Sequence, residues 1–158
     1  MPAGAAREFF DRIISELAMR FDAPVFEPHL TLFVTPEGSH APRKVLCEVP
    51  SPDLRLVVRE IDSSENFTKT LFVRFDPNQM LLDLVEAIRK SSGGSKEYEI
   101  DPHLSLVYKT LPAKTKSALT EQLQLPFSEV PFEGIRAMRC KSPTKTADDV
   151  REWKLLVT

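Results

Sequence analysis

Two of the three histidines in this chain of 158 residues lie in nearly identical surroundings. His29 and His103 each follow a proline and precede a leucine, a hydroxyl residue and a second leucine, in the segments PHLTLFV (28–34) and PHLSLVY (102–108). With average residue usage, such a frame surrounds a given histidine by chance about once in ten thousand. A single copy would be read as an ordinary strand, but two copies favour a shared chemical purpose.

Two imidazoles can supply both halves of an acid–base reaction. Hydrolysis of a phosphodiester needs a base that takes a proton from water and an acid that protonates the departing oxygen. Imidazole titrates near neutral pH, so one ring can be neutral while its partner is charged. The hydroxyls of Thr31 and Ser105 can donate hydrogen bonds to the non-bridging oxygens of the phosphate. The sequence does not assign the acid and the base.

Both motifs are predicted to be strands, because strand alternation places these groups correctly. In residues 28–34 the leucines point to one face, while His29 and Thr31 project from the other, about 7 Å apart. The same alternation in residues 102–108 places His103 and Ser105 side by side. Each motif therefore presents one histidine and one hydroxyl on a single face.

The remaining pattern predicts the elements that must position the two motifs. Apolar residues at three- and four-residue steps predict a helix that ends near Phe21. Asp76, Pro77 and Gln79 resemble a capped helix start, and this helix should end near the glycines 93–94 with Met80, Leu81, Leu84, Val85 and Ile88 facing inward. A third helix is expected over residues 112–123, with Leu119 and Leu123 buried. Strands are expected over residues 53–61, 68–75, 127–140 and 150–158, and a helical turn or two near residues 43–49.

This mixed order of elements differs from alternating βαβ units, and no glycine-rich phosphate loop follows a strand. The fold class expected is therefore α+β with mainly antiparallel sheets. Because each motif is followed by helix and strand material, two pseudo-symmetric halves within one domain over residues 1–158 are expected.

Composition narrows the functional classes. The chain is 42% apolar and 28% charged, with a net charge of −2, so no broad basic surface for long nucleic acid is expected. No apolar run approaches the roughly 20 residues of a membrane span. Charged residues interrupt the apolar stretch of the amino-terminal segment, which makes it a poor secretory signal. Cys47 and Cys140 cannot form a disulfide framework and have no metal-ligand spacing, although whether they pair stays open. A cytoplasmic protein without a structural metal is expected.

The constellation resembles the 2H phosphoesterase superfamily, whose signature is two copies of His-x-[Thr/Ser], each followed by an apolar residue. It is most similar to the cyclic nucleotide phosphodiesterase branch. There the first motif follows a phenylalanine and a proline, as in PVFEPHLTL (24–32), and the second carries a tyrosine five residues after the histidine, where Tyr108 stands. The motif spacing, the chain length and the closing tryptophan segment extend the resemblance over the whole chain.

The resemblance implies a bilobal, pseudo-two-fold α+β domain with helices on the outside and the motif strands adjacent in a central cleft. It implies hydrolysis of 2′,3′-cyclic nucleotides or ADP-ribose 1″,2″-cyclic phosphate without a metal or other cofactor. His29 and His103 would then be the catalytic acid–base pair. Thr31, Ser105 and Tyr108 would bind the substrate. The partner expected is this small substrate, with no long nucleic acid, no membrane and a monomer by default.

Tyr108 conflicts with ideal strand alternation, which places it on the face opposite His103. A bulge or twist at the strand end must supply its reach; alternatively it is a core aromatic with its hydroxyl at the surface. Among the other residues, His40 is expected at the surface, Arg74 in a surface or structural ion pair such as one with Asp76, and Trp153 in packing. Lys141 and Lys145 could meet further phosphates of a larger ligand.

Two other functions compete with this reading. An enzyme acting on RNA ends or on 2′–5′ linkages would favour a basic groove, which the charge balance disfavours. A binding module without turnover would not need a paired acid and base.

Overall fold

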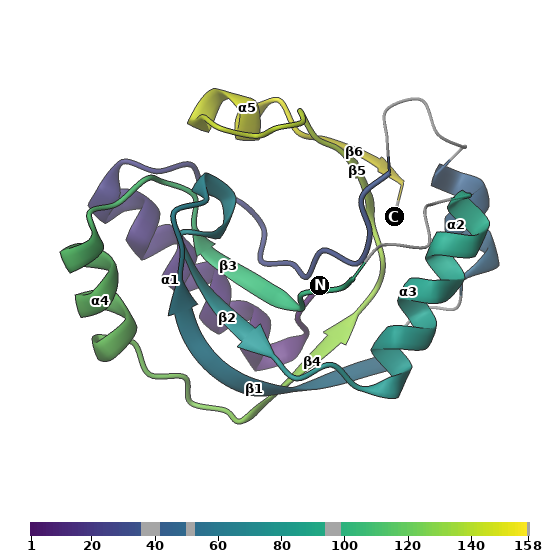
Figure 1. Cartoon of the computed structure of the whole chain (residues 1–158), viewed down its shortest axis with the longest axis horizontal. Helices are drawn as coiled ribbons and strands as arrows, with labels where there is room; N and C mark the ends of the chain where they lie inside the picture. The colour runs from purple at the N-terminus through teal and green to yellow at the C-terminus, as the bar shows by residue number, and fades with distance from the viewer. Residues whose placement is uncertain (36–41, 50–52, 94–98, 158) are drawn as a thin grey trace.

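Four antiparallel strands form a curled sheet at the centre of the computed structural model, which describes residues 1–35, 42–49, 53–93 and 99–157 (Figure 1). Their order is β3 (His103–Val107), β2 (Leu71–Phe75), β1 (Asp53–Ser63) and β4 (Glu129–Glu133). In the ladder between β1 and β2 the register shifts between Val58 and Glu60, which leaves one extra residue in the long strand β1. Such a bulge bends and twists a strand, in keeping with the curl of the sheet.

A second sheet pairs β5 (Ala137–Arg139) with β6 (Lys154–Val157), again antiparallel. Figure 1 shows these strands and the short helix α5 (Ala147–Arg151) at the top of the view, above the curled sheet. Because every strand pair among the described residues is antiparallel and helices flank the sheets, the expected α+β class is confirmed.

One face of the curled sheet forms the main hydrophobic core. Helices α1 (Gly4–Phe21) and α4 (Ala113–Gln122) contact this sheet. The core cluster combines buried residues of these helices with the inward residues of all four strands: Phe10, Leu17, Leu119, Leu54, Leu56, Leu71, Val73, Phe75, Leu104, Leu106, Val130 and Phe132. The alternation that buries these residues directs their strand neighbours to the opposite face of the sheet.

Most of the strongly periodic segments adopt the predicted elements. The first helix, the turn now seen as α2 (Pro42–Glu48), the strands β1 and β3, and the helix α4 all lie where the pattern placed them. Helix α3 (Gln79–Ser92) ends at Gly93 in the left-handed conformation, as expected for the glycine pair. No helix within the described ranges combines the length and apolar composition needed to cross a membrane.

Several boundaries were predicted wrongly. Phe67–Lys69 form a 3₁₀ turn (η1), so β2 begins only at Leu71. Residues 127–140 contain two strands, because Gly134 takes a positive φ of 64° between them. Val150 belongs to helix α5, which Thr146 begins with a capping box. Met80 is 56% exposed, whereas Leu81 is fully buried.

The first motif is extended but does not form a regular strand. Its one β-bridge in residues 28–34 joins Leu30 to Leu104 in an antiparallel sense. Pro28 has no N–H to give to a ladder, which limits pairing on that side of the bridge. The strand predicted for residues 28–34 is therefore reduced to a single paired residue at the edge of β3.

The start of α3 was also predicted with the wrong cap. Asp76 forms an ion pair with Arg59 at 2.6 Å, whereas the Asn78 side chain accepts the N–H of Leu81 at 3.0 Å and donates to the Arg55 carbonyl at 2.8 Å. We expect Asn78→Ala to lower the free energy of unfolding by about 1 kcal/mol. Asp76→Ala, which removes only an exposed ion pair, should cost about half of that or less. Urea denaturation measures both, and equal losses would contradict this assignment of the cap.

Candidate active site

The bridge between Leu30 and Leu104 brings the two motifs together. In an antiparallel pair, the neighbours of bridged residues lie opposite each other, so His29 lies opposite Ser105 and Thr31 opposite His103. Side chains paired in this way have Cβ atoms about 5 Å apart on one face. Each histidine thus lies across from the hydroxyl residue of the other motif.

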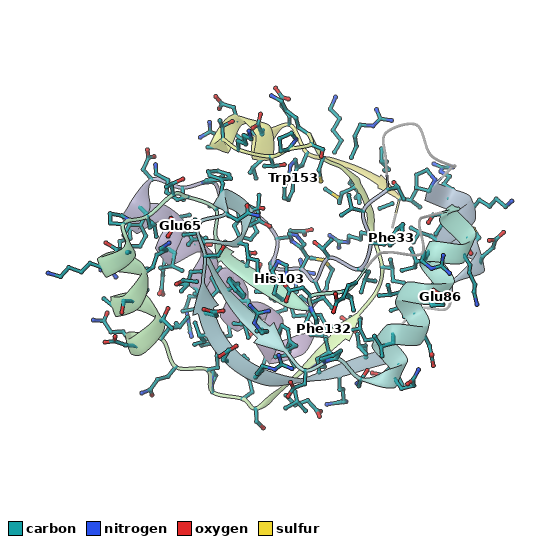
Figure 2. The ribbon with its side chains drawn as sticks, viewed as in Figure 1. Phe33, Glu65, Glu86, His103, Phe132 and Trp153 are labelled. Atoms are coloured by element: carbon teal, nitrogen blue, oxygen red, sulfur yellow. The ribbon has the colours of Figure 1, made fainter. Side chains whose placement is uncertain are left out.

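Strand β2 extends this polar face on the other side of β3. Arg74 pairs with His103 and Phe72 with Ser105 in the register. The Phe72 and His103 rings meet edge to face with centroids 5.5 Å apart. Figure 2 shows His103 in the middle of the molecule, with Trp153 pointing toward it from the segment between α5 and β6.

Both imidazoles are held by the same type of hydrogen bond. The Nδ1 atom of His29 lies 2.7 Å from the carbonyl oxygen of Glu27, and that of His103 lies 2.7 Å from the carbonyl oxygen of Asp101. A carbonyl can only accept, so Nδ1 carries the proton in each ring. The Nε2 atom of each neutral ring is therefore the atom that can accept a proton.

A bulge brings Tyr108 to the histidine face. The register between β2 and β3 shifts between Leu71 and Phe72, so that Leu71 pairs with Val107 and the alternation of β3 moves by one residue. The hydroxyl of Tyr108 accordingly lies 3.4 Å from Nε2 of His29. Tyr108 is nevertheless buried, so it is a packed aromatic whose hydroxyl faces the site. Burial raises its pKa well above the ordinary value, so this hydroxyl stays protonated.

Aromatic rings surround His29 and Tyr108. Phe26 stacks on Tyr108 with centroids 3.8 Å apart, and Trp153 meets Tyr108 at 5.7 Å and His29 at 6.1 Å. Among the described residues, Nε1 of Trp153 is the one buried side-chain nitrogen or oxygen without a hydrogen-bond partner. The expectation of packing for Trp153 is thus met, and it leaves one donor unused beside His29.

The two hydroxyl residues differ in what they can offer. Thr31 is exposed, and within the described ranges its hydroxyl makes no hydrogen bond. Ser105 is buried, and its hydroxyl donates to the carbonyl of Thr68 at 2.7 Å. Thr31 is therefore free to donate to a ligand, whereas Ser105 must first give up its bond to Thr68.

A cationic pair lies beside His103. The carboxylate of Asp101 pairs with Lys69 and with Arg74, and Arg74 also pairs with Glu60 at 3.4 Å and Asp62 at 3.2 Å. The structural ion-pair role predicted for Arg74 is confirmed, but its partners are these acids and Asp76 is not among them. Sequence reasoning missed Lys69 and Asp101.

The pKa of each histidine is lowered. For His29, burial is the main cause, and the charges of the Met1 amine and His103 act in the same direction against the bond to Glu27. For His103, burial again leads, and the charges of Lys69 and Arg74 oppose the raising effect of Asp101. The free site therefore favours neutral rings, and a bound anion would favour the charged form.

Several other residues singled out from the sequence lie apart from this arrangement. His40 lies outside the described residues. Lys141 pairs with Asp149 at 2.6 Å, and among residues 1–35, 42–49, 53–93 and 99–157 the Lys145 side chain makes no contact with this site. Cys47 and Cys140 are free thiols. Two surface hollows, of about 520 and 410 Å³, lie at α4 with the end of β1 and at α1 with β4, and neither is lined by a histidine.

Metal-ligating residues do not gather at the site. Within the described part of the chain, no three His, Cys, Asp or Glu side chains are grouped so that they could hold a metal ion.

The repeated histidine motif on one face of an α+β fold is the arrangement of a 2H phosphoesterase, and the chain is a phosphodiesterase of that superfamily. Within it, the chain belongs to the family described as cyclic phosphodiesterase-like protein, whose model matches residues 1–158. No match to a curated protein was found.

The lowered pKa values can be tested directly. In a proton NMR titration of the ring Cε1–H signals, we expect His29 and His103 to titrate below about 6.5, the ordinary value for histidine. Addition of inorganic phosphate should raise at least one of the two, because a nearby anion favours imidazolium. Alanine variants of the three histidines assign the signals. Titration of both rings above 6.5 in the free protein would contradict the electrostatic account.

Proposed function

We propose that the protein hydrolyses small cyclic phosphodiesters, namely 2′,3′-cyclic nucleotides or ADP-ribose 1″,2″-cyclic phosphate, with His29 and His103 as the acid–base pair. The observation that carries the proposal is the bridge at Leu30 and Leu104, which sets each histidine opposite the other motif's hydroxyl. Membership of the cyclic phosphodiesterase-like family supports the same reaction class.

The reaction needs only one proton transfer at each histidine. One neutral ring takes a proton from water at Nε2 while the water oxygen forms a new bond to phosphorus. The bond from phosphorus to one ribose oxygen breaks, and the other ring, as imidazolium, gives its Nε2 proton to that oxygen. The pair ends with its protonation states exchanged and is restored by proton exchange with water.

The charge of the bound substrate can raise the pKa of one imidazole enough to make it the acid. Both rings tend to be neutral in the free site, but the negative charge of a cyclic phosphate raises the pKa of an adjacent imidazole. Thr31 can donate to a non-bridging oxygen without breaking another bond, and the protonated hydroxyl of Tyr108 can donate beside His29. Such donors are worth most when they meet charge that grows in the transition state.

The surroundings favour a small ligand over a long RNA. The charges nearest His103 are balanced locally, because Lys69 and Arg74 already pair with acids, and the net charge of the chain is −2. A groove that follows a nucleic-acid backbone requires unpaired basic side chains. Aromatic rings beside His29 suit a nucleoside instead. Activity on 2′–5′ linkages or RNA ends is the competing outcome of the same assay.

The acid–base assignment is tested with His29→Ala and His103→Ala. Each variant should lose about 10²-fold or more of kcat on 2′,3′-cyclic AMP, the range typical for loss of a general acid or base. Turnover by the unmodified protein should persist in chelator. His40→Ala is the matched control and should retain turnover. Near-normal activity in either of the first two variants would exclude the paired mechanism.

The free indole N–H of Trp153 is proposed to donate to the bound substrate. A buried donor without a partner costs about 1–3 kcal/mol, which a substrate oxygen can recover. Trp153→Phe keeps an aromatic ring but removes the N–H, so KM should rise about tenfold while kcat changes less than about threefold. Leu155→Ala, at an exposed position of β6, is the control. An unchanged KM in Trp153→Phe would show that the indole only packs.

A further inference from the structure

The residue two positions before each histidine is acidic in both motifs. The segments read Glu27-Pro28-His29 and Asp101-Pro102-His103, and in both the carbonyl of the acidic residue accepts the Nδ1 proton of the histidine at 2.7 Å. The repeat therefore extends further toward the amino terminus than the leucine and hydroxyl pattern shows, and it includes the acceptor that sets the tautomer.

Each of these acids is held by two cations from distant parts of the chain. Glu27 pairs with Arg7 of α1 at 3.1 Å and with Arg136, which lies just before β5. Asp101 pairs with Lys69 of η1 and with Arg74 of β2. The side chains of Glu27 and Asp101 are 53% and 46% exposed. Half-exposed ion pairs contribute little to stability, so stability alone does not explain why the arrangement occurs twice.

The local backbone explains how a carboxylate can direct a ring. The carbonyl in question belongs to the peptide that joins the acid to proline, and proline has a fixed φ. Proline also restricts the preceding residue to extended conformations. Pro28 and Pro102 are both buried, which fixes one side of this peptide. The two cations bound to the acid's carboxylate restrain the acidic residue on the other side of this peptide. They thereby restrain the direction in which its carbonyl points.

We propose that Glu27 and Asp101 are positioning residues, each of which orients one histidine through its own main-chain carbonyl while two cationic side chains hold its carboxylate. The two pairs of cations come from unrelated positions in the sequence: Arg7 and Arg136 pair with Glu27, whereas Lys69 and Arg74 pair with Asp101. A repeated arrangement with unrelated partners points to a requirement of the site. The kinetic part of this inference rests on the proposed function, but the orientation of the rings does not.

The carboxylates are ionised at neutral pH. Burial alone would raise the pKa of Asp101 and of Glu27, but the bonds and charges of their cationic partners bring both below the ordinary value. The charges facing His103 are Asp101, Lys69 and Arg74. Those facing His29 are Glu27, the Met1 amine and His103. In both cases the acid raises the pKa of its histidine, so its neutralisation should lower that pKa.

The test uses Glu27→Gln and Asp101→Asn in the full chain, with the ring titration as the first measurement. Glu27→Gln should lower the pKa of His29 and leave His103 nearly unchanged, and Asp101→Asn should do the reverse. On 2′,3′-cyclic AMP, kcat should fall about tenfold with KM within about threefold, as expected when a partner that orients a histidine is lost. The conservative variants Glu27→Asp and Asp101→Glu should recover most of this loss, because the two motifs already use either acid.

The control is Glu86→Gln on α3, which breaks ion pairs with Arg89 and Lys90 far from His103 (Figure 2). It should match the unmodified protein in both measurements. The inference is overturned if Glu27→Gln and Asp101→Asn behave like Glu86→Gln, or if each shifts both histidines equally. If either variant fails to fold, Arg136→Gln or Lys69→Gln, which loosens one clamp, must lower the pKa of the corresponding histidine alone, because loss of the cationic charge by itself would raise that pKa. If the unmodified protein has no turnover, the proposed function fails, while the titrations still decide the positioning role.

Discussion

The site depends on one antiparallel bridge at the edge of the curled sheet. Leu104 is fully buried, and its bridge to Leu30 aligns two segments that are far apart in the chain. Because side chains alternate along extended backbone, burial of the leucines forces the histidines and hydroxyls onto the other face. A slip of one residue would exchange the two sets and bury the histidines in the core. The hydrophobic core therefore fixes the geometry of the polar face.

The charges and the burial around the two histidines then set their protonation. Burial holds the pKa of both histidines low, while the cations near His103 are compensated by Asp101, Glu60 and Asp62. The positive and negative charges of the free site thus nearly cancel, so the charge of a bound anion would not be offset by residues already present. The family to which the chain belongs gives its reaction class, and an anion next to the imidazoles would favour their charged form.

The carboxyl-terminal segment completes the site from the opposite side. Trp153 reaches His29 and Tyr108 from the connection between α5 and β6, and Phe26 supports Tyr108 from the segment before the first motif. These rings belong to a hydrophobic cluster separate from the main core, together with Ile14 and Val150. The aromatic packing links α1, the first motif, the end of β3 and the last helix, so the surroundings of His29 depend on segments that are far apart in the sequence.

The sequence by itself determined the features that follow from local periodicity. The repeated motif identified the histidines and hydroxyls, alternation placed each pair on one face, and regular apolar spacing located α1, α3 and α4. The tertiary structure decided which residues meet across segments. It set the register at Leu30, the bulge that turns Tyr108 toward His29, and the cations that hold Glu27 and Asp101. The acids were visible in both motifs, but their role required knowing the direction of a carbonyl and the approach of side chains from remote elements. Such contacts arise from packing between distant segments, and no local pattern encodes them.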